Sequence, residues 1–104
     1  MIRDLPLAEC RLDLPGLRAQ RERYTQLASS VRCLERQPGR LLVEFRDGFD
    51  AALLDEALAV ERECCPLFRL DFVADERRLT AGVEHSHQEP ALDALRFQLS
   101  GPGA

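Results

Sequence analysis

The sequence contains no tryptophan, few other aromatic residues and no long apolar run. Aromatic residues make up 6% of the 104 residues, so no basic stripe is interleaved with aromatic side chains as in many nucleic-acid-binding surfaces. The formal charge of -4, from 14 basic and 18 acidic side chains, also disfavours binding to the phosphates of a nucleic acid. No stretch approaches the ~20 apolar residues that a membrane-spanning helix needs. We therefore expect no nucleic-acid partner and no association with a membrane.

The first residues also lack the apolar run of a secretory signal peptide. We therefore expect a cytoplasmic protein. In that reducing compartment, its four cysteines would be free thiols or metal ligands rather than disulfides. The length predicts a single domain over residues 1–104, with a frayed tail at 100–104.

Motifs of several common enzymes are missing as well. No serine–histidine–aspartate set, no phosphate-binding loop and no His-Glu-x-x-His helix can be recognised. Common hydrolases and nucleotide-dependent enzymes are therefore disfavoured, although other kinds of catalysis stay open. We expect a binding protein rather than an enzyme.

The spacing of apolar residues predicts an α+β fold. Alternation of apolar and polar residues predicts strands over 7–12, 31–36, 40–46, 68–73 and 79–83. Helical spacing predicts helices over 15–30, 50–64 and 90–99. This order fits a ferredoxin-like β-α-β-β-α-β arrangement with an extra strand and a C-terminal helix, in which the helices cover one face of an antiparallel sheet. If 7–12 is not a strand, an α-β-β-α-β-β-α sandwich of the same kind remains.

The most informative feature is the adjacent pair Cys64-Cys65, at the predicted end of the second helix. A disulfide between neighbouring residues would strain the peptide between them, and a thioredoxin-like pair needs two intervening residues. The negative end of the helix dipole raises the pKa of a thiol, so this position does not favour a redox nucleophile. A soft cation favours the thiolate form instead, because thiols lose their protons as they bind the cation. Candidate ions are Cu(I), Zn(II), Hg(II) and arsenite.

A stable site for such an ion usually needs a third sulfur, and Cys10 is the candidate. In a ferredoxin-like sheet, the end of the first strand lies near the end of the second helix. Cys10 and Cys64-Cys65 would then meet at one pole, with a sulfur pair within roughly 6 Å. Glu61, one turn before the pair, could be a fourth ligand, a proton acceptor for a thiol or a solvated carboxylate. Cys33 lies near the opposite pole, and we expect it to be buried in the core.

The run Glu61-Arg62-Glu63-Cys64-Cys65-Pro66-Leu67-Phe68 resembles a motif of a family of small bacterial proteins. In that family, a glutamate and two further residues precede Cys-Cys-Pro-Phe, or a close variant, which leads into a strand. Cys10-Arg11-Leu12 is similar to the early cysteine that the members carry. The members look like companions of heavy-metal-responsive regulators and resistance genes. The resemblance covers mainly residues 60–73 and implies a link to thiophilic metals or metalloids, although Leu67 stands where an aromatic residue is common.

Our leading hypothesis is that the chain binds a soft metal or metalloid ion through Cys10, Cys64 and Cys65, with Glu61 as a further candidate ligand. His85 and His87 form a His-x-His pair that could also bind a metal, but a solvated loop explains them more simply.

Two rival hypotheses remain. In a thiol-dependent enzyme or redox protein, one cysteine would act as a nucleophile with Glu61 as its base. In a structural or interaction module, the cysteines would only fill the core, and a homodimer would form through the exposed face of the sheet. The residues expected on that face are Arg32, Leu34, Leu42, Glu44 and Val73.

Overall fold

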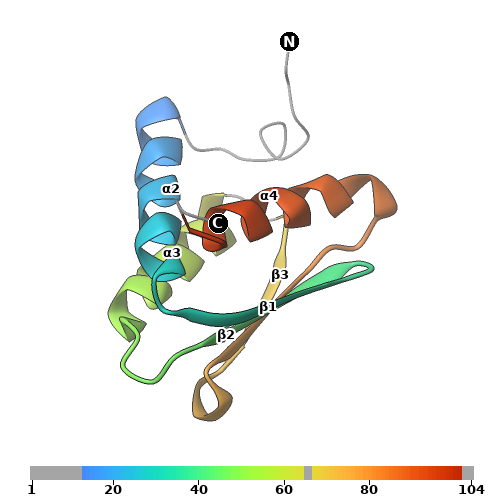
Figure 1. Cartoon of the computed structure of the whole chain (residues 1–104). Coiled ribbons are helices and arrows are strands. Elements are labelled where there is room, and N and C mark those ends of the chain that lie inside the picture. Colours follow the sequence, from blue (N-terminus) through green and yellow to red (C-terminus); the bar gives the residue numbers. More distant parts are fainter. Residues whose placement is uncertain (1–12, 65–66, 102–104) are drawn as a thin grey trace.

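Helices and pairs of strands alternate along the chain in this computed structural model, which describes residues 13–64 and 67–101. In chain order, the described elements are α2 (Leu14–Ala28), β1 (Val31–Gln37), β2 (Arg40–Phe45), α3 (Ala51–Cys64), β3 (Arg69–Val73), β4 (Arg78–Gly82) and α4 (Glu89–Leu99). Short 3-10 helices, η1 (Ala74–Glu76) and η2 (Ser86–Gln88), precede β4 and α4. The strands form one antiparallel sheet, and the described helices lie on one of its faces (Figure 1). The predicted α+β fold with a C-terminal helix is confirmed.

Both α2 and α3 begin after an aspartate that caps the helix. The Asp13 carboxylate accepts a hydrogen bond from the backbone N–H of Gly16 at 2.8 Å, and Pro15 lies in the first turn of α2. The Asp50 carboxylate likewise accepts from the backbone N–H of Leu53 at 3.0 Å. Each carboxylate pairs with an N–H group that the first turn of a helix leaves without a partner. The starts of these two helices therefore follow from local sequence.

The strands lie in the order β1-β2-β4-β3, and each neighbouring pair is antiparallel. The additional strand, β4, is therefore an interior strand between β2 and β3. In a ferredoxin-like sheet the first strand would lie beside β3, and in the described sheet β4 has that place. The segment 7–12, predicted as the first strand, lies outside the described residues. Over the described part of the chain, the order of elements is α-β-β-α-β-β-α.

An irregularity in β1 changes which of its side chains face the helices. The register with β2 shifts between Val31 and Cys33, so that Val31 pairs with Phe45 and Leu34 pairs with Val43. An extra residue in one strand reverses the alternation of side chains beyond it. Leu34, expected on the exposed face, therefore packs against the core, and Cys33, expected in the core, is exposed. Both expectations were wrong because strict alternation does not anticipate a bulge.

The core lies between the helices and the side of the sheet that faces them. Its buried side chains are Tyr24, Leu27, Leu41, Val43, Phe45, Leu54, Ala57, Leu58, Leu79, Ala81, Leu92, Leu95 and Leu99. Phe45, Phe49 and Phe72 form an aromatic cluster beside them, with ring centroids 5.0 to 6.5 Å apart. Phe72 packs against the core but is only partly buried, because it lies on the edge strand β3. None of the described helices combines the length and the apolar character that a membrane span requires.

Candidate functional site

The structure describes two of the four candidate ligands, Glu61 and Cys64. Cys64 is the last residue of α3, and Glu61 lies one turn before it. Cys10 and Cys65 lie outside the described residues, so the three-thiol arrangement stays a prediction. Within the described ranges, no three histidine, cysteine, aspartate or glutamate residues form a group that could hold a metal ion. Of the four candidate ligands, Glu61 is the one whose side-chain environment the structure describes.

Glu61 is buried where α3 contacts α2, with 6% of its surface exposed. Its Oε2 accepts hydrogen bonds from the Tyr24 hydroxyl at 2.7 Å and from Nε2 of Gln20 at 3.1 Å. The Gln20 amide also donates to the backbone carbonyl of Ala57 at 2.9 Å. Gln20 and Tyr24 are each 4% exposed, and we call Gln20, Tyr24 and Glu61 the buried polar cluster. The alternative in which Glu61 is a solvated carboxylate is therefore wrong.

Arg23 fixes the orientation of the Gln20 amide. Its guanidinium donates to Oε1 of Gln20 at 2.8 Å and to Oε2 of Glu56 at 3.3 Å. Because the amide oxygen accepts from Arg23, the amide nitrogen of Gln20 faces Glu61. Glu56 is exposed, so a chain of hydrogen bonds runs from the helix surface to the buried carboxylate.

Burial shifts the pKa values of two groups in the buried polar cluster. Burial raises the pKa of the Glu61 carboxyl above its usual value, and the hydrogen bonds from Tyr24 and Gln20 offset part of this increase. Burial also raises the pKa of the Tyr24 phenol well above its usual value, and the nearby Glu61 carboxylate adds to the increase. Tyr24 therefore stays protonated near neutral pH and continues to donate to Glu61. Among the described residues, no buried side-chain nitrogen or oxygen lacks a hydrogen-bond partner.

The polar contacts also show how α2 and α3 run relative to each other. Gln20 contacts Glu61, and Arg23, further along α2, contacts Glu56. Contacts that step forward along α2 step backward along α3, so the two helices are antiparallel. The start of α2 and the end of α3 therefore lie at the same end of the helix pair (Figure 1). Cys10 precedes α2 by four positions, so both parts of the predicted thiol site join the described structure at this end.

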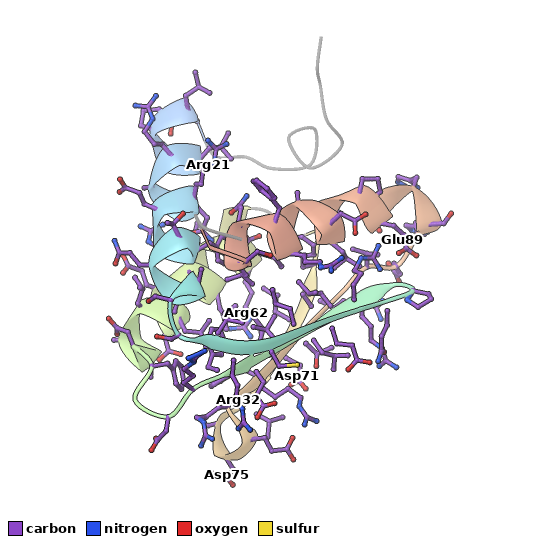
Figure 2. All side chains as sticks on the ribbon, in the orientation of Figure 1. Arg21, Arg32, Arg62, Asp71, Asp75 and Glu89 are labelled. Atoms are coloured by element: carbon purple, nitrogen blue, oxygen red, sulfur yellow. The ribbon has the colours of Figure 1, made fainter. Side chains whose placement is uncertain are left out.

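Cys33 belongs to a different part of the molecule. It is exposed on β1, the edge strand opposite β3, and β3 is the strand that follows the cysteine pair in the chain. It lines an open pocket of about 290 Å³. The other residues of this pocket are Ala28, Val31, Arg32, Leu34, Leu99 and Ser100. Figure 2 shows Arg32 and Asp71 on the side of the sheet away from the helices.

The two histidines lie at η2, and both are exposed. The rings of His85 and His87 stack, with centroids 5.5 Å apart and planes 9° from parallel. The carboxylate of Glu84 lies 4.0 Å from Nε2 of His85. In the part of the chain that the structure describes, these imidazoles belong to no group of three candidate ligands that could hold a metal ion.

Gln20 was not predicted as part of this region. Tyr24 fits the inner apolar stripe of α2, but its hydroxyl was not expected to contact Glu61. The overlooked indication was spacing, because Gln20 lies four residues before Tyr24 and seven before Leu27, on the same face of the helix. A polar residue inside such a stripe needs a buried partner, which here is Glu61.

No protein-family model matches the chain, and no curated protein and no solved structure is significantly similar to it.

Proposed function

We propose that the protein binds a soft metal or metalloid ion in the cytoplasm, through the thiols of Cys10, Cys64 and Cys65. The observation that carries this proposal is the adjacent cysteine pair at the end of α3, directly beyond a turn that is anchored by buried hydrogen bonds. At a helix C-terminus the dipole opposes thiolate formation, so a bound cation is the simplest source of compensating charge. Soft ions such as Hg(II), arsenite, Cu(I) and Zn(II) are the chemical class that thiolates select.

Chain geometry supports the inclusion of Cys10. Gln20 and Glu61 are in contact, Asp13 lies about 10 Å before Gln20 along its helix, and Cys64 lies about 5 Å beyond Glu61. With helix axes about 8–10 Å apart, Asp13 and Cys64 are then separated by roughly 10–12 Å. Three residues of extended chain span about 10 Å, so the sequence that precedes Asp13 is long enough to bring Cys10 to the end of α3.

Glu61 fits the ligand set less well than the thiols do. Its Oε2 already accepts two hydrogen bonds inside the helix interface. Carboxylates are also harder ligands than thiolates and add little selectivity for soft ions. We therefore assign coordination to the three cysteines and treat Glu61 as a residue that supports the helix.

Titration of the reduced full-length protein with arsenite and Hg(II) tests the proposal, with thiolate charge-transfer absorption and the mass of the complex as readouts. Cys64→Ser and Cys65→Ser should weaken the binding of both ions strongly. Cys10→Ser should weaken arsenite binding more than Hg(II) binding, because arsenite prefers three thiolates and Hg(II) accepts two. Cys33→Ser is the matched control and should bind like the wild type. Equal binding by the wild type and the Cys64 and Cys65 variants would refute the proposal.

The interaction-module rival is favoured by one observation. The described helices lie on one face of the sheet only, and the other face carries both signs of charge around Leu42, with Glu44 and Arg78 adjacent in one row. A second copy could pack on such a face. Sedimentation at increasing protein concentration distinguishes this case, since a dimer that Leu42→Arg dissociates would support it.

The enzyme rival makes a kinetic prediction. A catalytic thiol has a lowered pKa and is alkylated unusually fast near neutral pH. Iodoacetamide rates for Cys64 and Cys65, measured against the exposed Cys33 in the same chain, decide between a nucleophile and an ion ligand. Rates no faster than that of Cys33 would exclude the nucleophile.

A further inference from the structure

We infer that Gln20, Tyr24 and Glu61 are positioning residues, which hold the last turn of α3, and with it the backbone of Cys64, in one place beside α2. The consequence for ion binding rests on the proposed function, whereas the effect on the helix end does not. Nothing in the resemblance or in the cysteine spacing requires this role for Gln20 and Tyr24.

The first argument is energetic. A buried carboxylate loses the hydration that it would have at the surface, and apolar side chains of similar size would often hold two helices together at lower cost. Of the described residues, only Gln20, Glu61 and Gln88 are buried with polar or charged side chains, and two of these three belong to this cluster. Hydrogen bonds between buried groups form at only one relative placement of the two helices, unlike apolar contacts, which tolerate sliding. The arrangement therefore favours a defined register over maximal stability.

The second argument is geometric. The Gln20 amide contacts both the Ala57 carbonyl and the Glu61 carboxylate, which are one helical turn apart on α3. Tyr24 contacts the same carboxylate from the next turn of α2. Contacts from two turns of α2 to two turns of α3 fix both the rotation of α3 about its axis and its position along that axis.

The third argument concerns the end of the helix. Terminal turns of helices open easily, because their last carbonyl groups lack intrahelical partners. The cluster attaches α3 at Glu61, within the last four residues of the helix, Glu61–Cys64. Ligands that are already held in place bind an ion more tightly, since less conformational freedom is lost on binding. Loss of the cluster should therefore weaken ion binding even though no thiol is removed.

Amide hydrogen exchange and arsenite titration of four full-length proteins test this inference. Tyr24→Phe removes one hydroxyl and keeps the aromatic ring in the core. Glu61→Gln keeps an oxygen that can accept from Tyr24, and it serves as the conservative variant. Val43→Ala is a control, because it creates a cavity in the centre of the sheet and destabilises the protein without touching the cluster.

In Tyr24→Phe, we expect exchange over 61–64 to rise by about tenfold relative to exchange over the second turn, 55–58, whose amides have intrahelical partners. Arsenite affinity should fall by a similar factor. Val43→Ala should raise exchange evenly along α3 and leave the affinity of the folded protein unchanged. Glu61→Gln should retain most of both wild-type properties, because its amide oxygen replaces the carboxylate as acceptor.

Two results would overturn the inference. One is exchange over 61–64 that Tyr24→Phe leaves no faster than in the wild type, and this result needs no bound ion. The other is faster exchange at an unchanged arsenite affinity, which would make the cluster a stabilising contact only. If wild-type protein and Cys64→Ser bind arsenite equally, the proposed function fails, and the exchange measurement still decides whether the cluster holds the helix end.

Discussion

Two helix contacts of this molecule, that of α4 with the sheet and that of α2 with α3, are built in opposite ways. Where α4 meets the sheet, the buried side chains are apolar, namely Ala91, Leu92, Leu95 and Leu99. The charges of this contact lie at its rim, where Arg36 pairs with Glu89 at 2.7 Å and with Asp93 at 2.9 Å. Where α2 meets α3, the polar groups of the buried polar cluster lie inside, and the charged pair of Arg23 and Glu56 lies at the surface.

The two contacts differ in whether they mainly stabilise the fold or mainly define its geometry. Apolar burial stabilises in proportion to area and imposes little direction, so the contact of α4 should contribute most to the free energy of unfolding. Buried hydrogen bonds contribute less net free energy but demand one arrangement, so the contact of α2 with α3 should define where the end of α3 lies. Figure 2 labels Glu89 at the start of α4, near the β1–β2 turn, where the backbone N–H of Gly39 donates to its carboxylate.

The largest effect should come from the apolar contact. Leu92 is fully buried, and Leu92→Ala removes three carbon atoms of the side chain and leaves a cavity. We expect a loss of about 2–5 kcal/mol in the free energy of unfolding, measured by urea denaturation. Ala94→Gly, at an exposed position of the same helix, is the control for helix propensity and should cost only about 1 kcal/mol. A loss below about 1 kcal/mol for Leu92→Ala would show that α4 is not held by its apolar face.

Removal of the buried carboxylate should have the next largest effect. Glu61→Ala leaves the Tyr24 hydroxyl without its acceptor in the interior. We expect a loss of about 1–3 kcal/mol, because an unpaired buried donor keeps its desolvation cost. Glu63→Ala removes the same charge from an exposed position of the same helix and should change stability much less. Equal losses for the two variants would contradict a special role for the cluster.

The two contacts also differ in how far the sequence predicts them. The apolar stripe of 90–99 and the alternation of Leu41, Val43 and Phe45 predict the contact of α4 with the sheet, because burial follows from periodicity. The starts of α2 and α3 were also predictable, since Asp13 and Asp50 cap these helices through contacts only three residues away. The α+β class follows from these local patterns.

The rest depends on contacts between residues far apart in the sequence. The bulge in β1 moved Cys33 and Leu34 to the faces opposite those expected, and no residue type in that strand marks a bulge. The interior position of β4 is a choice among strand orders that all bury the same apolar faces. The partners of Glu61 are 37 and 41 residues away, so its burial could not be read from the helix that carries it.

The pH dependence of stability sharpens the comparison. Because the pKa of Glu61 is raised in the folded protein, the folded state holds this proton more tightly than the unfolded state does. This group therefore lowers stability as the pH rises from the ordinary carboxyl value of 4.5 through the raised value. Glu61→Gln should remove that decline in urea unfolding measured at several pH values, and Glu63→Gln should not. If stability still declines with pH in Glu61→Gln, another titratable group causes the decline.

The smallest effect should come from the rim of α4, and its pH dependence should have the opposite sign. The backbone N–H of Gly39 and the guanidinium of Arg36 both donate to Oε1 of Glu89, at 3.1 Å and 2.7 Å, and they lower the pKa of this carboxyl. The unfolded state then holds the proton more tightly, so Glu89 stabilises the fold above its ordinary value of 4.5, and this contribution disappears as the pH falls through the lowered value.

Glu89→Gln should therefore lose stability near neutral pH and show less acid sensitivity than the wild type. The loss should shrink in high salt, because the Glu89 side chain is 31% exposed, and Asp93, which pairs with the same Arg36 guanidinium, is 62% exposed. Glu22→Gln, an equal change of charge on the exposed side of α2, is the control. If salt leaves the loss unchanged, the hydrogen bond to the Gly39 backbone outweighs the ion pair, and the rim of α4 would resemble the buried polar cluster more than its exposure implies.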